Sequence, residues 1–485
     1  MLRTKARYDK IIEALDAKNL AMSVRTIPFD GGELSILYIK QLTDRAGLAD
    51  NVVKPLIQHC SIEKKPLKAA EVMDTAVYAD DCRLESDEEK IAEFILAGTV
   101  VIIFSTDKQY LVINLKQIEH RQIPTPETTY ALRAPKDCFT ENLDVNIALI
   151  RYRVKDENLR IKTFEVGRRT KTSVAVVYIE DIANDTAVTE IQKRIEAIDI
   201  DGIGESGELQ AFLLNKKSNL FPQMGLLERS DMAYNTLVEG KVLTLVEGSP
   251  VCLVAPKVFA EYFHSCDDRY DNKYFGAFMR LIRYAALYIA LASSSLYVAI
   301  IAFNTSVLPG EYAIAVAEMR SKVPLSAFVG ALVLEFLIEL VREALLRVPK
   351  QIGPAVGIVG TIIIGQAAIA SGVFSPLLLI IVSISLLASF AIGDYSMANP
   401  FRILKFALLI FTGAFGFYGF VLCISLILIS LVSVNSFGVP FLAPFAPFKW
   451  YDFIRSIFFN VSISPLRPKY LRNKDKKRAK TSSPD

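Results

Sequence analysis

The sequence has few of the residues on which metal centres depend. Its 485 residues include three histidines and six cysteines. The one close pair of possible ligands, His264 and Cys266, has no second pair to complete a site. We therefore expect no metal and no cofactor, and we expect reduced, buried thiols at the widely spaced Cys60, Cys82, Cys138, Cys252, Cys266 and Cys423.

Catalytic motifs are also lacking. The first half has no Walker loop, no dinucleotide-binding glycine fingerprint and no nucleophile elbow. Its glycine-rich stretch GIGESG, residues 202–207, lacks the third glycine and any following Lys-Ser or Lys-Thr, so we interpret it as a turn. Since histidine, cysteine and carboxylate residues form no usable constellation, we predict that the protein is not an enzyme. The net charge is +3, and we expect no nucleic-acid partner.

The start of the chain has no continuous apolar core of the kind found in a cleaved secretory signal. Residues 1–30 alternate charged and apolar groups, so we expect the first half to stay in the cytoplasm. From about Asp271 to about Val434 the charges become sparse and long apolar runs dominate. The fold predicted is a soluble α/β region of two similar subdomains, residues 1–140 and 141–272, followed by an α-helical polytopic membrane domain, residues 273–448, and a basic cytoplasmic tail, residues 449–485.

The two soluble subdomains are predicted from an internal repeat. LSILYIKQLTD, residues 34–44, and VAVVYIEDIAN, residues 174–184, are both runs of β-formers that lead into a helical pattern. We interpret them as copies left by duplication, with chance similarity as the alternative. Two β-hairpins are predicted, one over residues 99–115 across Asp107 and Lys108, and one over residues 241–256 joined at Gly248.

Five segments of the second half are long and apolar enough to approach the roughly 20 residues that cross a bilayer. They are residues 281–303, 324–341, 352–370, 374–392 and 404–434. The last is overlong, and FGFYGF near its middle, residues 415–420, predicts a kink or a strong tilt.

The basic residues place both ends of this domain in the cytoplasm, which requires an even number of crossings. Arg280 and Arg283 precede the first segment, and nine lysines and arginines follow Trp450. We do not count residues 324–341 as a membrane crossing, because the helix that they begin is amphipathic. Such a helix can lie in the membrane–water interface or line a water-filled space. Four crossings remain, and five crossings are the alternative. With four crossings, the basic stretch 342–350 lies away from the cytoplasm or dips only part-way into the bilayer.

The segment 352–370 carries small residues at every fourth position. Such residues let helices approach closely in lipid, so we predict a helix-packing surface of Gly353, Gly357, Gly360, Thr361 and Gly365. Gln366 lies in the same region, where its amide needs partners. It either bonds to a neighbouring helix or lines a pore.

Three acids lie on one face of the amphipathic helix, at i, i+4 and i+8: Glu335, Glu339 and Glu343. Glu343 has Arg347 at i+4 as a salt-bridge partner, whereas Glu335 and Glu339 have no such partner on the helix. Two interpretations stay open. The acids either form rings around an axis between copies of the chain, where they select cations, or form salt bridges to another helix.

Several stretches in this order resemble the A subunit of GerA-type spore germinant receptors over nearly the whole chain. They are TSVAVVYIEDI from Thr172, LFPQ from Leu220, LVEGKVLTLVEGSPVCLVAP from Leu237, REALLRVPKQIGPAVGIVGTIIIGQAAIASGVFSP from Arg342 and FGVPFLAPFAP from Phe437. The chain departs from the family pattern at Arg229-Ser230-Asp231, where the family tends to have Arg-Pro-Asp, and at Ala344-Leu345, where it tends to have Ala-Gly. The related stage V sporulation AF branch shares the architecture.

The resemblance implies a protein of the spore inner membrane that acts with a transporter-like B subunit and a lipoprotein C subunit. In the family, the A subunit is expected to oligomerise into a channel for monovalent cations whose opening starts germination. The alternatives are a secondary transporter, for which the second half shows no matching repeat of membrane segments, and a scaffold that conducts nothing.

Overall fold

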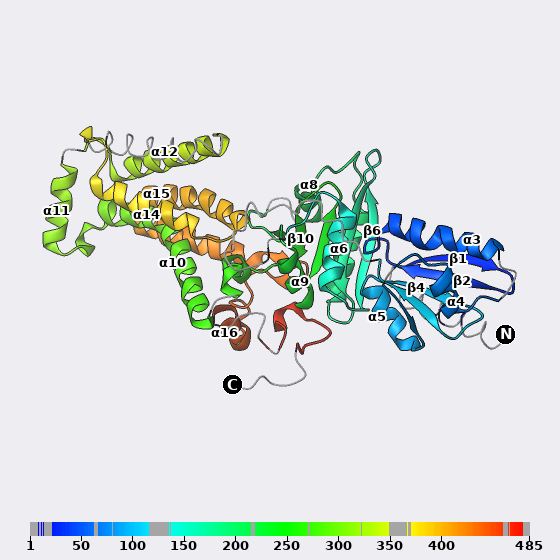
Figure 1. The fold of residues 1–485 in the computed structure, drawn as a ribbon. Coiled ribbons are helices and arrows are strands. Elements are labelled where there is room, and N and C mark those ends of the chain that lie inside the picture. The colour runs from blue at the N-terminus through cyan, green and yellow to red at the C-terminus, as the bar shows by residue number, and fades with distance from the viewer. Residues whose placement is uncertain are drawn as a thin grey trace. The chain divides into compact units, whose positions relative to one another are not determined.

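The computed structural model describes residues 22–62, 66–79, 81–115, 137–214, 219–269, 272–321, 323–348, 370–458 and 466–478, together with single positions such as 366 and 464. The chain divides into two compact units (Figure 1). The α/β unit comprises Met1–Lys217, Met224–Pro256 and Pro465–Asp485, and the helical unit comprises Ser218–Gln223 and Lys257–Ser464.

The first subdomain of the α/β unit is a five-stranded sheet of order β1-β2-β4-β5-β3. Its strands are β1 Ser23–Phe29, β2 Gly32–Tyr38, β3 Cys82–Glu85, β4 Val100–Phe104 and β5 Tyr110–Ile113. Its helices are α2 Arg45–Leu48, α3 Lys54–Ile62, α4 Ala69–Thr75 and α5 Ile91–Leu96. Alternate residues of β4 enter two separate apolar clusters, so both faces of the sheet are covered.

The second subdomain repeats this arrangement strand for strand, in the order β6-β7-β9-β10-β8. Its strands are β6 Leu159–Val166, β7 Thr172–Ile179, β8 Gly225–Leu227, β9 Val242–Val246 and β10 Cys252–Ala255. Its helices are α6 Leu143–Arg153, α7 Asp185–Glu196, α8 Ser206–Leu213 and α9 Ser230–Val238. The predicted α/β region is therefore confirmed, and β4–β5 and β9–β10 are the two predicted hairpins.

The turns that follow β2 and β7 have the same structure, which explains why both sequence copies end on a residue that can cap a helix. Asp44 and Asn184 end the copies, and each caps the helix that follows, accepting hydrogen bonds from the Ala46 and Thr186 amides at 3.0 Å. A cap of this kind satisfies an amide that has no partner within the helix. The strand, the turn and the cap are thus conserved between the copies as one local structure.

The helical unit contains α10 Lys273–Val298, continued by a π-helical turn Ala299–Phe303, and then α11 Gly310–Arg320, α12 Ala327–Arg347, α14 Pro376–Phe390, α15 Tyr395–Ser433 and α16 Trp450–Phe458. A small ladder, β11 Asn435–Ser436 with β12 Val439–Pro440, follows α15. Among the described residues, Lys273–Phe303 and Tyr395–Ser433 are long and apolar enough to cross a membrane, and Pro376–Phe390 is a shorter apolar helix.

The 39-residue α15 reverses direction at Gly416, whose φ of 63° and ψ of −142° are not helical. Lys257 contacts both ends of α15, since its amide donates to Ser436 Oγ at 3.1 Å and its ammonium lies 2.5 Å from Asp394 Oδ2. A straight helix of this length would hold those ends almost 60 Å apart. The kink predicted within residues 415–420 is therefore confirmed at Gly416, where a glycine with positive φ divides the segment into a hairpin of two arms, 395–415 and 417–433.

The helical unit has two ends, named here the base end, around Lys257 and Asp394, and the tip end, around Gly416. A Cβ atom on Gly416 would lie 2.9 Å from the Phe303 ring, and one on Gly413 would lie 2.2 Å from the Phe328 ring. The end of α10 and the start of α12 therefore lie at the tip end. Helix α12 packs against α10, α14 and α15, so it is a member of the bundle in this structure.

The predicted basic tail, residues 449–485, is divided between the units. Helix α16 belongs to the helical unit, whereas residues 466–478 pack on the second α/β subdomain. Arg467 Nε donates to the Val238 carbonyl at 2.8 Å, and Asn184 Nδ2 donates to the Leu471 carbonyl at 3.1 Å. Residues 466–478 are thus fixed to the second subdomain of the α/β unit.

Candidate functional site

The site centres on ion pairs between α12 and the first arm of α15, here called the ion-pair ladder: Glu335, Glu339, Arg342, Arg402 and Lys405. Glu335 is 1% exposed. One of its carboxylate oxygens lies 2.5 Å from Lys405 Nζ, and the other accepts a hydrogen bond from Ser294 Oγ of α10 at 2.5 Å. Two other helices, α10 and α15, therefore supply the partners of one buried carboxylate on α12.

Glu339 forms the next rung, one helical turn nearer the base end. Arg402 donates to Glu339 Oε2 through both Nε, at 3.1 Å, and Nη2. Arg342 Nη1 lies 3.3 Å from the other carboxylate oxygen, and Arg342 Nη2 donates to Ser389 Oγ of α14 at 3.0 Å. Partners at i+4 alone were predicted from the sequence, whereas Arg342 lies at i+3 from Glu339.

The other candidate residues predicted from the sequence are not part of the ion-pair ladder. Glu343 pairs with Arg347 at 2.8 Å, as predicted, and both side chains are exposed. Gln366 is helical and exposed. The predicted packing residues Gly353, Gly357, Gly360, Thr361 and Gly365 lie outside the described residues.

The ladder holds two acids and three bases, and every acid in it has a base within 3.3 Å. A buried pair of this kind is costly to break, because removal of one partner leaves an uncompensated charge, at about 3–5 kcal/mol. Within one chain, Glu335 and Glu339 are therefore neutralised and linked to α15. An exchange of partners along the ladder would change both the local charge and the contact between α12 and α15.

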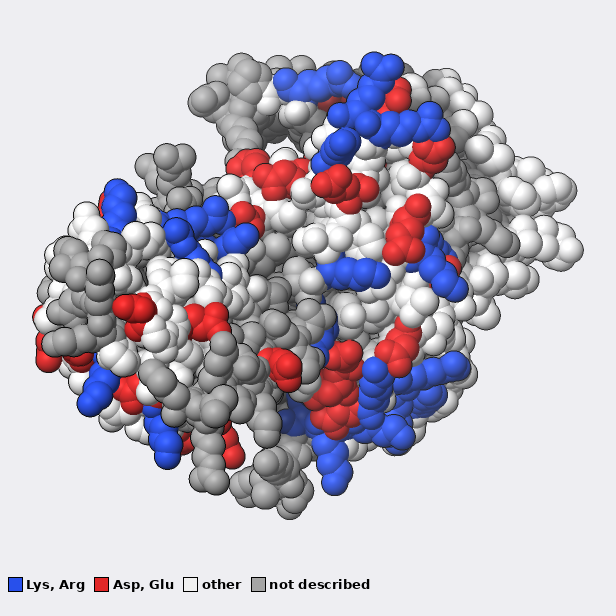
Figure 2. Space-filling model, turned by 90° about the vertical axis from the view of Figure 1, so that its right-hand side faces the viewer, with Lys and Arg blue, Asp and Glu red and all other residues white. Residues whose placement is uncertain are grey.

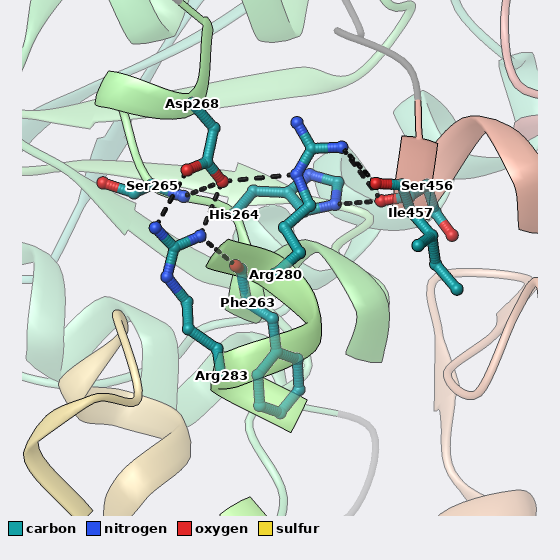
Figure 3. Close-up of polar contacts among 8 residues, drawn as sticks. All are labelled: Phe263, His264, Ser265, Asp268, Arg280, Arg283, Ser456 and Ile457. Atoms are coloured by element: carbon teal, nitrogen blue, oxygen red, sulfur yellow. Dashed lines mark hydrogen bonds and ion pairs between the residues drawn. The ribbon is translucent and has the colours of Figure 1, made fainter. Parts of the chain in front are cut away.

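A second buried cluster lies at the base end of α10 (Figure 3). Asp268 accepts hydrogen bonds from Arg283 at 2.6 and 2.9 Å and from Arg280 Nε at 3.2 Å. Arg280 Nη1 also donates to the Ser456 and Ile457 carbonyls of α16, at 3.3 and 3.1 Å. Both arginines, counted in the sequence as cytoplasmic surface charges, therefore hold the base end together from inside the fold.

Burial by itself raises the pKa of Asp268, but the hydrogen bonds and charge of Arg283, the Ser265 amide and the charge of Arg280 hold that pKa below its usual value. The carboxylate stays ionised at neutral pH. His264 Nε2 lies 2.9 Å from the Ser456 carbonyl oxygen, so this ring binds α16. The described residues contain no group of three or more possible metal ligands.

Two of the stretches that carry the family resemblance meet in an aromatic cluster at the base end. Phe221 of LFPQ packs with Phe441 of FGVPFLAPFAP, with ring centroids 6.2 Å apart, and both are buried. Tyr262 packs on Phe441 at 6.0 Å and donates to the Pro222 carbonyl at 3.1 Å. Stretches more than 200 residues apart thus form one packed core at the base end.

Basic and acidic side chains are interspersed over the face of the molecule seen in Figure 2. Their charges largely offset one another on that face. Among the described residues, buried ion pairs occur in both units, for example Arg229–Asp231 in the α/β unit and Glu335–Lys405 in the helical unit.

The chain belongs to the GerA family: the family described as Bacillus/Clostridium GerA spore germination protein matches residues 9–470. Spore germination protein KA of Bacillus subtilis (strain 168) is 32% identical over 451 residues, which cover 93% of this chain and 82% of KA. Spore germination protein GerLA of Bacillus cereus is 32% identical over 461 residues, which cover 94% of this chain and 93% of GerLA. The resemblance drawn from the sequence is confirmed, and this family is not a known enzyme family.

Among solved structures, the N-terminal domain of the A subunit of the Bacillus megaterium spore germinant receptor GerK3 is similar to this chain. It is 23% identical, with a TM-score of 0.39, and the match covers 52% of this chain and 94% of that one.

Three residues of these clusters were not predicted from the sequence: Lys405, Arg402 and Asp268. A signal existed for the first two, because Arg402 and Lys405 interrupt an otherwise apolar stretch and lie at i and i+3 on one helix face. Asp268 gave no such signal, since it lies in a charged stretch that looks like an ordinary loop.

Proposed function

We propose that this chain is the membrane subunit of a spore nutrient (germinant) receptor that assembles with copies of itself into a nutrient-gated cation channel. It would act in the spore inner membrane with a transporter-like B subunit and a lipoprotein C subunit. The observation that carries the proposal is the ion-pair ladder, which is buried inside a helical bundle whose outside is apolar.

The apolar outside supports the membrane assignment. Large apolar side chains are exposed along both arms of α15, among them Ile410, Phe415, Tyr418, Leu426 and Ile429. In water such a surface is costly, whereas lipid is its natural solvent. Relatives that are spore germination proteins support the same assignment.

The hairpin in α15 changes the proposed number of crossings from four to six. Helix α14 begins near the tip end, where Gly330 faces Leu378, and ends near the base end, where Arg342 bonds to Ser389. The six are α10, α12, the predicted segment 352–370, α14 and the two arms of α15. An even number agrees with the packing of residues 466–478 on the α/β unit, which puts both on one side, proposed to be cytoplasmic.

The ion-pair ladder is proposed to act as a latch. With Glu335 bound to Lys405 and Glu339 bound to Arg402, the acids are unavailable to a passing cation. Nutrient binding would release these pairs and present the carboxylates to a path between copies of the chain. Glu343 and Gln366, which are exposed in the single chain, would line the same path, and Gly353, Gly357, Gly360, Thr361 and Gly365 would pack the copies together.

Cation flux from liposomes that contain this chain with its B and C subunits tests the proposal. The variants are Glu335→Gln, Glu339→Gln and Lys405→Met, with Glu311→Gln in the exposed first turn of α11 as the control. We expect nutrient-dependent flux from the wild type, leak without nutrient from Lys405→Met, and altered cation selectivity from the two glutamine variants. Intact assembly is checked by co-purification.

Each alternative predicts a different result. A secondary transporter would show saturable, substrate-coupled flux that the nutrient itself accompanies across the membrane. A scaffold would show no flux from an intact complex, and the variants would change assembly only. Either result would contradict the proposal.

A further inference from the structure

Helix α16 distributes its residues in the opposite way to a helix on the surface of a water-soluble domain. Asp452 is 1% exposed and Arg455 is 4% exposed, and Ser456 is buried beside them. Trp450, in contrast, is 66% exposed, and Phe458 is 48% exposed. The polar face of α16 therefore points into the protein, and the aromatic face points outward.

The inward face of α16 is fixed to the base end of α10. Arg280, itself 3% exposed, donates to the carbonyls of Ser456 and Ile457, and His264 binds the Ser456 carbonyl (Figure 3). These contacts use the last turn of α16, where carbonyl groups have no partner within the helix. Buried hydrogen bonds therefore fix the orientation of α16 and, with it, the direction in which its aromatic face points.

The outward face continues an aromatic series that begins in the core. Phe445 packs on Phe453 with ring centroids 5.6 Å apart, and Phe453 packs on Phe448 at 5.3 Å and on Trp450 at 6.2 Å. Phe448 and Trp450 are more than half exposed. The rings are thus held rigidly by their neighbours while their outer surfaces have no protein contact in the described structure.

We propose that α16 lies in the membrane–water interface at the base end of the helical unit, with Phe448, Trp450, Tyr451 and Phe458 inserted among the lipid glycerol groups and upper acyl chains. This inference rests on the membrane part of the proposed function. Its occupant is the lipid bilayer. The helix would fix the depth at which the bundle sits, because it ties a lipid-bound surface to the buried cluster around Asp268.

Two observations favour lipid over a second protein. Tryptophan and tyrosine prefer the bilayer interface, where an apolar ring body and a polar N–H or O–H group are both solvated. In addition, α10 continues the same kind of surface at the base end with Tyr274, Phe275 and Phe278, all exposed. These three residues lie in the first two turns of the apolar span Lys273–Phe303, where a bilayer boundary would fall.

The sequence contains one tryptophan, so fluorescence of the full-length chain reports on α16 alone. The chain is reconstituted into phosphatidylcholine–phosphatidylglycerol vesicles whose lipids carry bromine near the headgroup or deep in the acyl chain, and acrylamide is the aqueous quencher. We expect emission shifted to the blue, and shallow bromine should quench about twofold more than deep bromine. Trp450→Phe should abolish the signal.

A reference variant separates this inference from the membrane assignment. Trp450→Phe combined with Leu426→Trp moves the tryptophan to the middle of the second arm of α15, where deep bromine should quench more strongly. If Leu426→Trp behaves so but Trp450 is quenched by acrylamide and not by lipid, the interfacial helix is overturned and the membrane bundle stands.

Two further outcomes also overturn the inference. Trp450 emission that is blue-shifted yet insensitive to both quenchers would place a protein, such as a second copy, on this face. Failure of lipid bromine to quench either tryptophan would overturn the membrane part of the proposed function together with the inference.

Discussion

The two units differ in where their large apolar side chains lie; each also buries an ion pair, which in the α/β unit is Arg229–Asp231. In the α/β unit, strands such as β7 and β9 are buried, while ion pairs such as Arg168–Asp199 lie on the surface, with both side chains about two-thirds exposed. In the helical unit the pair Glu335–Lys405 is buried, while Tyr418 is 70% exposed.

Two helices show the contrast most directly. Helix α7 buries Ala187, Val188, Ile191 and Ile195 and keeps its acids and bases outside. Helix α16 buries Asp452, Arg455 and Ser456 and exposes its rings. The same amphipathic principle produces both, and the outward direction of the apolar face of α16 supports the lipid surroundings proposed for the helical unit.

Lys405→Met should give the largest effect, because it leaves the Glu335 carboxylate buried without its base. We expect a loss of about 3–5 kcal/mol in the stability of the helical unit. The measurement is thermal unfolding in detergent, followed by a thiol-reactive dye that reports the buried cysteines. Combining Lys405→Met with Glu335→Gln should recover most of the loss, and Arg168→Ala on the α/β surface should leave the Tm unchanged. Equal losses of stability from Lys405→Met and Arg168→Ala would contradict the expected difference between the buried and the surface ion pair.

Leu426→Lys should come next, since it places a charge on the outer face of α15. At the centre of a membrane helix a lysine costs about 2.5–3.5 kcal/mol of insertion free energy. Tyr78→Lys, at an exposed apolar position of the α/β unit, is the matched control and should be neutral. The fraction of chain that resists carbonate extraction from membranes measures the difference. Full insertion of Leu426→Lys would argue that this face meets water or protein.

Asp268→Asn tests the buried cluster through its pH dependence. Because the folded pKa of Asp268 is depressed, its contribution is complete above the unfolded value, near 3.8, and is lost as the pH falls through the folded value. At pH 7 we expect the variant to lose about 2 kcal/mol, since hydrogen bonds to charged groups contribute about 1.5–3 kcal/mol. The difference in Tm between wild type and variant should shrink as the pH falls below 4. A difference that stays constant from pH 7 to pH 3 would contradict this assignment.

The smallest effects are expected at the paired helix caps of the α/β unit. Asp44→Ala and Asn184→Ala should each destabilise their subdomain by about 1 kcal/mol, because each leaves one helix amide unsatisfied. Chemical unfolding measured by hydrogen exchange, subdomain by subdomain, checks both. A loss at one cap alone would show that the two copies no longer use the turn in the same way.

The parts predicted correctly from the sequence are those that local signals determine. Runs of β-formers ending at Asp44 and Asn184 predicted strand, turn and helix, and Gly248 marked a hairpin. The stretch FGFYGF predicted a kink within residues 415–420, whereas the full reversal of α15 depends on the backbone angles of Gly416, which no local pattern determines.

The ion-pair ladder lay beyond the sequence analysis for a different reason. Glu339 and Arg402 are 63 positions apart, and no periodic pattern links two helices across such a distance. The same holds for Arg280 with Ser456, 176 positions apart. The acids on α12 were found from their spacing, whereas their partners required the packing of the bundle.

The most direct test of the membrane bundle is side-specific labelling at the two ends of the α15 hairpin. Tyr418→Cys, beside the reversal, Asn435→Cys, just after the second arm, and Glu196→Cys, on the α/β unit, are each made in a background with Cys60 and Cys82 changed to serine. A membrane-impermeant thiol reagent is then applied to sealed vesicles of known orientation. We expect Asn435→Cys and Glu196→Cys to react from one side and Tyr418→Cys to react from the other. Labelling of all three from the same side would contradict a bundle that crosses the membrane with its reversal at Gly416.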